Sequence, residues 1–114
     1  MTIVLKKARN IVTEPFVAID AKLSLVDVVG SLEDAPFTAG ICELWASTPI
    51  TFERDDHAAV CFMLEGQATI TEGEVKLDFE QGDVVFLPQR EGLVVTWDTA
   101  SYGRWLYVTY PHRR

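Results

Sequence analysis

The densest group of side chains that could bind a ligand lies between residues 53 and 57. Glu53, Asp55, Asp56 and His57 all occur within this short stretch. Carboxylate oxygens and an imidazole nitrogen can hold a divalent cation, and the same groups can form the polar rim of a pocket. A solvated loop in front of a strand would have the same composition. Three interpretations therefore stay open, and the solvated loop and the polar rim are favoured over a metal site.

Two sulfur-containing side chains follow on the next apolar run. Ala59, Cys61 and Met63 share one face if residues 58–64 form a strand, because strand side chains alternate. Cys61 would act as a nucleophile only beside a base that favours its thiolate form. Cys42 lies in a different context and no CxxC motif occurs, which makes a shared metal site a weak prediction. Both cysteines are predicted to be free, buried thiols.

Aromatic residues supply a third kind of candidate. Trp97 and Tyr107, with Trp45 and Trp105, could wall a small-molecule cavity, and they could equally fill an ordinary core. GxGxxG, P-loop, HExxH and GxSxG motifs are absent, so their chemistries have no support, and no catalytic residue is assigned. The candidate ligand-binding residues are Glu53, Asp55, His57, Cys61, Met63, Trp97 and Tyr107.

Short strands must position these residues. The stretch 60–88, VCFMLEGQATITEGEVKLDFEQGDVVFLP, contains runs rich in Val, Ile, Phe and Thr that are cut by LEG, TEGE and EQGD. Each cut joins a glycine to acidic or polar residues, which is typical of turns. Short strands at even spacing, with no helical pattern between them, predict an all-β antiparallel barrel or sandwich.

The remaining segments follow the same pattern. Residues 1–15 are predicted to form an arm, in which 3–5 could be a short strand. Residues 16–29 are predicted to be extended, with a short helix near 24–29 as the alternative, and 51–57 to be a polar loop. Alternation predicts further strands at 37–47, 58–64, 93–97 and 104–110. On the first of these, Ile41, Glu43 and Trp45 share one face, and Cys42 and Leu44 share the other.

Length and charge limit the classes of function. A chain of 114 residues is expected to form one domain with a modest core, here 1–114. A net charge of −7 argues against nucleic acid and anionic membrane as partners. The first residues lack a signal-peptide pattern, and no apolar run reaches the length of a membrane span. We therefore expect a cytoplasmic protein with reduced thiols.

Two motifs resemble those of the cupin superfamily. The segment 53–66 ends in LEG, with Gly66 at the closing glycine of the first cupin motif. The segment GDVVFLP at 82–88 keeps the glycine–proline spacing of the second motif. The resemblance implies a small, single-domain RmlC-like jelly-roll β-barrel. It also implies an interior site where a metal is commonly bound by His, His, Glu and His.

One branch of cupins is particularly similar, the (S)-ureidoglycine aminohydrolase-type cupins, also called DUF861. The resemblance covers about residues 37–110 and rests on the order of Trp45, Pro49, Leu64-Glu65-Gly66, Gly82-Asp83, Pro88, Thr96-Trp97, Arg104 and Tyr107-Val108. This branch implies activity on a nitrogen-rich small molecule such as a ureido compound.

The metal-ligand positions depart from the cupin pattern. Aligned with the ligands stand Ala59, Leu93 or Val95, and either Glu53 and Asp55 or Phe52 and Arg54. Apolar side chains cannot coordinate a metal, and a catalytic centre needs three or four converging nitrogen or oxygen ligands. The chain has two histidines, of which His112 lies in the C-terminal PHRR. We therefore predict no tightly bound metal and no cofactor.

The favoured function is the binding of a small polar metabolite inside the barrel, without a metal. A carboxylate-lined pocket would prefer an amine or amide to an anion. The alternatives are a catalytic cupin acting on a nitrogen-rich molecule and a non-catalytic dimeric sensor or accessory protein. A homodimer is predicted because the run 58–64 is apolar on both faces, so its second face needs another sheet or another chain. The aromatic run 104–110 is a further candidate contact.

Overall fold

The computed structural model describes residues 3–16, 20–46, 49–53 and 56–111, without the side chains of residues 20, 21 and 53. These residues form β-strands and two short 3-10 helices, with no α-helix among them, which confirms the all-β prediction. The strands are β1 (Glu14–Phe16), β2 (Asp20–Val29), β3 (Thr38–Trp45), β4 (Ile50–Glu53), β5 (Ala58–Glu72), β6 (Val75–Glu80), β7 (Val84–Leu87), β8 (Val94–Asp98) and β9 (Tyr102–Tyr110); the helices are η1 (Ala8–Asn10) and η2 (Ser31–Glu33). None of the described residues forms a helix with the length and apolarity needed to cross a bilayer.

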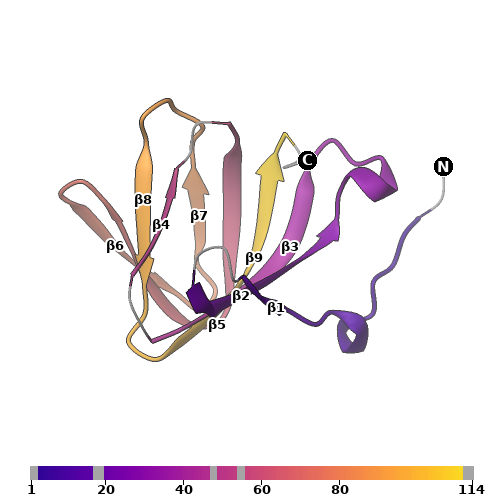
Figure 1. The fold of residues 1–114 in the computed structure, drawn as a ribbon, viewed down its shortest axis with the longest axis horizontal. Coiled ribbons are helices and arrows are strands. Elements are labelled where there is room, and N and C mark those ends of the chain that lie inside the picture. The colour runs from indigo at the N-terminus through magenta and orange to yellow at the C-terminus, as the bar shows by residue number, and fades with distance from the viewer. Residues whose placement is uncertain (1–2, 17–19, 47–48, 54–55, 112–114) are drawn as a thin grey trace.

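The strand β5 is the centre of the fold and pairs antiparallel with four other strands. Its first half lies between β7 and β9, and its second half pairs with β6 and β8. Beyond β9 the order continues through β3 and β2 to β1, and beyond β8 it ends at β4. The sheet curls so that β8 and β4 face β9 and β3 across an interior (Figure 1). This is the barrel that the turn spacing and the cupin resemblance predict.

The LEG segment does not end a strand, contrary to the prediction. β5 continues through 15 residues, and its ladder with β9 shifts register just before Gly66. Gly66 has a φ of +81°, and a Cβ there would collide with the backbone carbonyl oxygen of Tyr102. Only glycine tolerates both conditions, so it lets one strand bend from the first half of the sheet into the second. The predicted turns at TEGE and EQGD are confirmed between β5, β6 and β7.

Two other segments differ from the prediction. Residues 51–53, expected to begin a polar loop, belong to β4. The strand forms because Ile50 and Phe52 can face the interior while the backbone pairs with β8. Residues 3–5 form no strand. The predicted arm contains the single turn η1, and its last residues, Glu14 and Pro15, begin β1. The segment 20–29 is extended as β2, which confirms the favoured interpretation over a helix.

Alternation along the strands places one apolar cluster inside the curl. We call this the interior cluster, and its members come from every strand between β2 and β9: Leu23, Cys42, Leu44, Ile50, Ala59, Cys61, Met63, Ala68, Ile70, Phe79, Leu87, Leu93, Val95, Trp97, Trp105 and Tyr107. On β3, Cys42 and Leu44 belong to the interior cluster, whereas Glu43 and Trp45 do not, as the alternation predicts.

Candidate functional site

The inner face of β5 carries three of the residues that the sequence singles out or aligns with a ligand. Ala59, Cys61 and Met63 are 4%, 2% and 0% exposed, and all three belong to the interior cluster. Their shared orientation into the barrel is therefore confirmed. Cys61 and Cys42 are both buried and free of any disulfide, as predicted. Cys61 packs within the apolar interior cluster.

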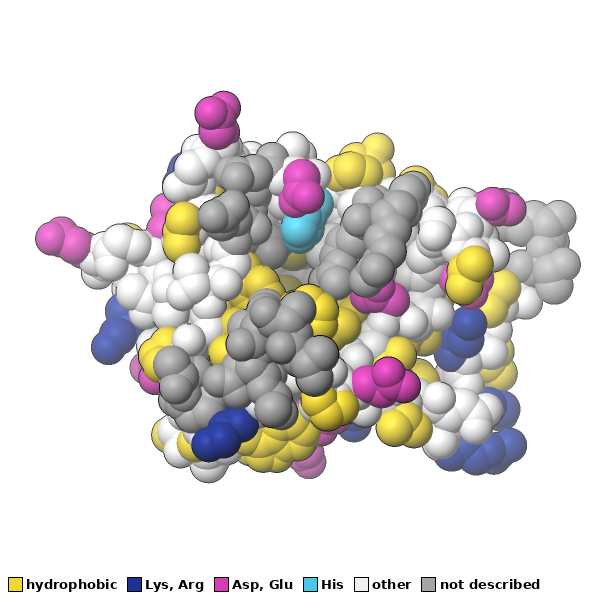
Figure 2. Space-filling model, viewed as in Figure 1, with side chains coloured by type: hydrophobic (Ala, Val, Ile, Leu, Met, Phe, Trp, Pro, Cys, Tyr) yellow, Lys and Arg dark blue, Asp and Glu magenta, His cyan; other side chains and the backbone are white. Residues whose placement is uncertain are grey.

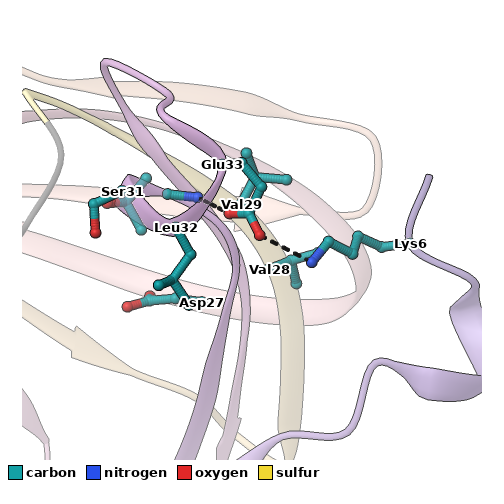
Figure 3. A pocket seen from close by; sticks show the side chains of 9 residues that line it. Lys6, Asp27, Val28, Val29, Ser31, Leu32 and Glu33 are labelled. Atoms are coloured by element: carbon teal, nitrogen blue, oxygen red, sulfur yellow. Dashed lines mark hydrogen bonds and ion pairs between the residues drawn. The ribbon is translucent and has the colours of Figure 1, made fainter. Parts of the chain in front are cut away.

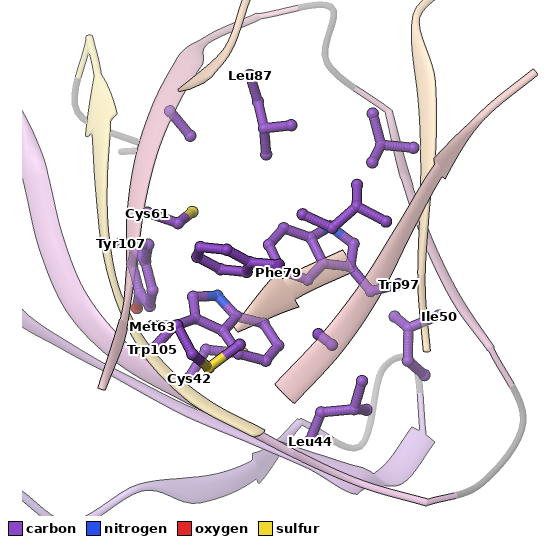
Figure 4. Close-up of a cluster of buried hydrophobic side chains, with 14 of the residues drawn as sticks. Cys42, Leu44, Ile50, Cys61, Met63, Phe79, Leu87, Trp97, Trp105 and Tyr107 are labelled. Atoms are coloured by element: carbon purple, nitrogen blue, oxygen red, sulfur yellow. The ribbon is translucent and has the colours of Figure 1, made fainter. Parts of the chain in front are cut away.

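Aromatic rings fill the middle of the interior (Figure 4). The indoles of Trp97 on β8 and Trp105 on β9 are stacked, with centroids 4.5 Å apart and planes 10° apart. Phe79 on β6 meets Trp97 edge to face, with centroids 6.0 Å apart. One group of aromatic rings thus joins three strands that are distant in sequence. Contacts between aromatic rings stabilise the fold by more than the burial of their apolar area alone. Trp97, a candidate cavity wall or core residue in the sequence, is 3% exposed in this group.

Tyr107 also lies in the interior, but its hydroxyl extends out of the interior cluster and contacts β2. The ring crosses over Gly40 of β3, where a Cβ would collide with the Tyr107 hydroxyl. The hydroxyl donates to the Asp27 carboxylate on β2 at 2.5 Å and lies 3.1 Å from the Val26 carbonyl oxygen. Its polar end is therefore already satisfied by the protein. Sequence reasoning missed Asp27 and Gly40, which gave no signal beyond their residue types.

His57 precedes β5 in phase with the inward row that begins at Ala59. Its side chain is 17% exposed, and its Nδ1 lies 2.5 Å from the carboxylate of Asp56, which is 84% exposed. This places His57 at an end of the barrel, with most of its side chain buried and its Asp56 partner in solvent. Of the other predicted rim residues, Asp55 lies outside the described residues. The side chain of Glu53 is not described either, but its backbone ends β4 and pairs with Val94.

The interior positions aligned with cupin metal ligands hold apolar side chains. Ala59, Leu93 and Val95 are each buried within the interior cluster. Within the described part of the chain, no group of three or more His, Cys, Asp or Glu side chains could hold a metal ion. The side chains at these three positions do not fit the metal that the cupin fold commonly carries.

A polar cluster that the sequence did not predict lies on the outer side of β3 and β9. Glu43 accepts hydrogen bonds from the hydroxyls of Thr13, at 2.5 Å, and Tyr102. Burial raises the pKa of Tyr102 well above its ordinary value, and the hydrogen bond to Glu43 raises it further. Trp45 packs against Tyr102, with ring centroids 5.5 Å apart, and is 40% exposed. The suggestion that Trp45 lines the barrel cavity is therefore wrong.

A surface pocket of about 280 Å³ lies between the arm and η2. Figure 3 shows Lys6 reaching the carboxylate of Glu33 across it, at 3.1 Å. The backbone N–H of Gly30 donates to the same carboxylate and lowers its pKa, and Lys6 lowers it further. Because these charged groups satisfy each other, we assign a structural role to this pocket and no ligand.

The curled sheet, with β5 at its centre and an apolar interior, defines the class of protein as a cupin. Residues 33–95, more than half of the chain, match the sequence profile of the family described as the cupin domain of mannose-6-phosphate isomerase. The chain belongs to this family of cupin domains. No curated protein matches its sequence.

Solved structures show the same fold at low sequence identity. Ectoine synthase from P. lautus superposes with a TM-score of 0.80 at 18% identity, over 96% of this chain and 79% of that one. An RmlC-like cupin from Shewanella frigidimarina NCIMB 400 gives 0.79 at 13%, over 99% and 95%. The putative ethanolamine utilization protein Q from Salmonella typhimurium LT2 gives 0.71 at 22%, over 78% and 69%. These likenesses bear on the fold alone, and the ureidoglycine aminohydrolase-type branch stays a prediction.

Proposed function

We propose that this protein is a cupin that binds a small molecule without a metal centre. The observation that carries the proposal is the set of side chains where the superfamily places its ligands. Ala59, Leu93 and Val95 are buried and apolar, and none of them can coordinate a metal. Binding without metal chemistry is the activity that such an interior supports best.

The largely buried His57 supports one end of the barrel as the place of binding. Its imidazole offers a hydrogen-bonding group, and the inward row from Ala59 continues from it into apolar and aromatic side chains. The carboxylate of Asp56 beside it, and a net charge of −7, disfavour anionic ligands. We therefore narrow the predicted polar metabolite to an amine or amide that carries an apolar portion.

The first test is elemental analysis of the purified protein. We expect zinc, manganese, iron and nickel to stay well below one atom per chain. A transition metal near one atom per chain that is lost in His57→Ala would refute the proposal. It would support instead the catalytic alternative, an activity on ureido compounds like that of the ureidoglycine aminohydrolase-type cupins.

The second test is a thermal-shift screen of small amines and amides against matched carboxylates. A ligand at about 100 times its Kd should add about 2.7 kcal/mol of stability, which raises the Tm measurably. We expect amines and amides to give the shift, and the paired change Glu53→Gln with Asp55→Asn to weaken it without unfolding the chain. Asp78→Asn with Glu80→Gln, the same change of charge on β6, is the control. Equal shifts with carboxylates, or equal loss in the control, would contradict the proposed ligand class.

A further inference from the structure

Among the described residues, the side chain of Thr109 is buried without a hydrogen-bond partner. Thr109 lies near the end of β9 and is 3% exposed, and its Oγ1 meets no donor or acceptor there. A hydroxyl that is taken out of water without a new partner costs free energy, so such groups are rare in folded proteins. The Thr109 hydroxyl is therefore a candidate contact for a molecule that is not part of the chain.

Thr109 faces the interior of the barrel. Along β9 it is in phase with Trp105 and Tyr107, which belong to the interior cluster. It pairs with Thr38 of β3 on one side and with Ala59 of β5 on the other. Directly paired residues place their side chains next to each other on one face of a sheet. The hydroxyl thus lies on the inner wall, between β3 and β5.

The side chains next to Thr109 do not supply a partner. Ala59 carries only a methyl group, and the Tyr107 hydroxyl extends to the Asp27 carboxylate of β2. The interaction that Thr38 makes is with atoms other than the Thr109 hydroxyl. A buried water usually makes about three hydrogen bonds to be held in place, whereas a ligand that is anchored by an apolar portion needs fewer. These neighbours therefore favour a ligand over a water molecule.

Thr109 and His57 lie at the same end of the barrel. His57 precedes Ala59 by two positions, and Ala59 pairs with Thr109, so His57 lies one step nearer to the end of the barrel. Figure 1 shows the start of β5 and the end of β9 side by side there. In Figure 2 a histidine side chain, in cyan, lies at the surface beside a recessed area in which hydrophobic side chains, in yellow, are visible. A molecule that enters beside His57 would therefore meet Thr109 on the inner wall.

We propose that Thr109 is a specificity-determining residue of the ligand site and that its hydroxyl binds a neutral primary amide. This inference rests on the proposed function and narrows its ligand class. A hydroxyl both donates and accepts, as a primary amide does, so the two groups can pair in either direction. An ammonium group would lose its hydration at this buried position, and a neutral hydroxyl does not offset that loss. The Asp27 carboxylate lies two strands away and already accepts the Tyr107 hydroxyl.

Removal of the hydroxyl with little change of shape tests whether it is unpaired. In Thr109→Val a methyl group replaces the hydroxyl, and we expect the Tm of the unliganded protein to stay equal or to rise, because no hydrogen bond is lost. Thr99→Val is the matched control, since Thr99 is also buried and its hydroxyl donates to the Gln67 carbonyl oxygen at 2.6 Å. We expect the Tm of the control to fall. An equal fall in both variants would show that the Thr109 hydroxyl is already paired, and would overturn the inference.

Binding of simple amides tests the assigned role. The probes are primary amides from propionamide to benzamide, each beside the amine and the carboxylate with the same carbon skeleton. We expect an amide to bind the wild type more tightly than its matched amine and carboxylate do. Thr109→Val should weaken that binding by about tenfold, and Thr109→Ser, which keeps the hydroxyl, should restore most of it.

Titration calorimetry separates failure of this inference from failure of the proposed function. An amide that binds the wild type and Thr109→Val with the same Kd would overturn the role of Thr109 and leave the proposed function standing. Tighter binding of the matched amine would overturn the amide as the ligand class. Failure of every amine and amide to bind the wild type would refute the proposed function, and this inference with it.

Discussion

The strand β5 presents two apolar faces in opposite environments. On the inner face, Cys61 and Met63 are 2% and 0% exposed among side chains from most other strands. On the outer face, Val60 and Phe62 are 44% and 39% exposed. Side chains alternate between the two faces along β5, and the rows on both faces are apolar. The inner row is therefore buried by this chain, whereas the outer row stays partly exposed.

This difference also separates the two roles that the sequence left open. An interior filled by Trp97, Trp105 and Phe79 leaves the end of the barrel near His57 as the place where we propose that a small molecule binds. The outer side, where Val60 and Phe62 are exposed, is the place where we predict that a second copy of the chain binds. Binding and dimerisation can thus occupy opposite sides of one strand.

The largest effect is expected from truncating the inner row. Met63→Ala should lower the free energy of unfolding by about 2–4 kcal/mol, because it leaves a cavity in a fully buried site. Phe62→Ala, one residue away, should cost about 1 kcal/mol or less when measured at protein concentrations low enough to dissociate a dimer. Urea denaturation of both variants gives the comparison. Equal losses would mean that the two faces are not different in packing.

A second large effect is expected where β3 passes under Tyr107. In Gly40→Ala the new Cβ would collide with the Val26 carbonyl oxygen and the Tyr107 hydroxyl. Because backbone cannot move away easily, we expect a loss of about 2 kcal/mol or more in the free energy of unfolding. Gly30→Ala is the matched control, since its Cβ would lie 3.7 Å from the nearest atom, on Thr38. A Tm for Gly40→Ala equal to that of the control would contradict the close crossing.

A smaller effect is expected from Tyr102 at high pH. Burial and then Glu43 raise the pKa of Tyr102 above that of the unfolded chain, near 10. The unfolded state therefore loses its proton first, so this contribution is complete below pH 10 and is lost as the pH rises toward the folded pKa. Above pH 10, stability of the wild type should fall more steeply than that of Tyr102→Phe, by at most about 1.4 kcal/mol per pH unit. Parallel slopes in urea titrations would contradict the assignment.

Much of the fold could be predicted because alternation and turn residues are local signals. The inward row of β5 and the two faces of β3 both follow from period-two patterns. The LEG segment was wrongly predicted to be a turn, because the same residues occur in a turn and at a bend within a strand. Only the close contact between Gly66 and the backbone of Tyr102 distinguishes the two cases, and a sequence does not show it. β4 was missed because its short sequence is half polar, and pairing with β8 outweighs that composition.

The candidate site could be predicted less well, because its decisive contacts join distant residues. Tyr107 and Asp27 are 80 positions apart, and Tyr102 and Glu43 are 59 apart. Neither pair leaves a pattern in a single sequence. The substitutions at metal-ligand positions could be found from motif spacing alone, and Ala59 does lie inside the barrel where that alignment predicts it.

Sedimentation of the wild type beside Phe62→Asp is the most direct test of the predicted homodimer, in which a second copy would cover the outer face of β5. We expect the wild type at tens of micromolar to have twice the chain mass of 12.8 kDa. Phe62→Asp should sediment as a single chain and keep the near-ultraviolet signal of the stacked Trp97 and Trp105. A wild type of 12.8 kDa, or a Phe62→Asp dimer as tight as the wild type, would contradict the claim.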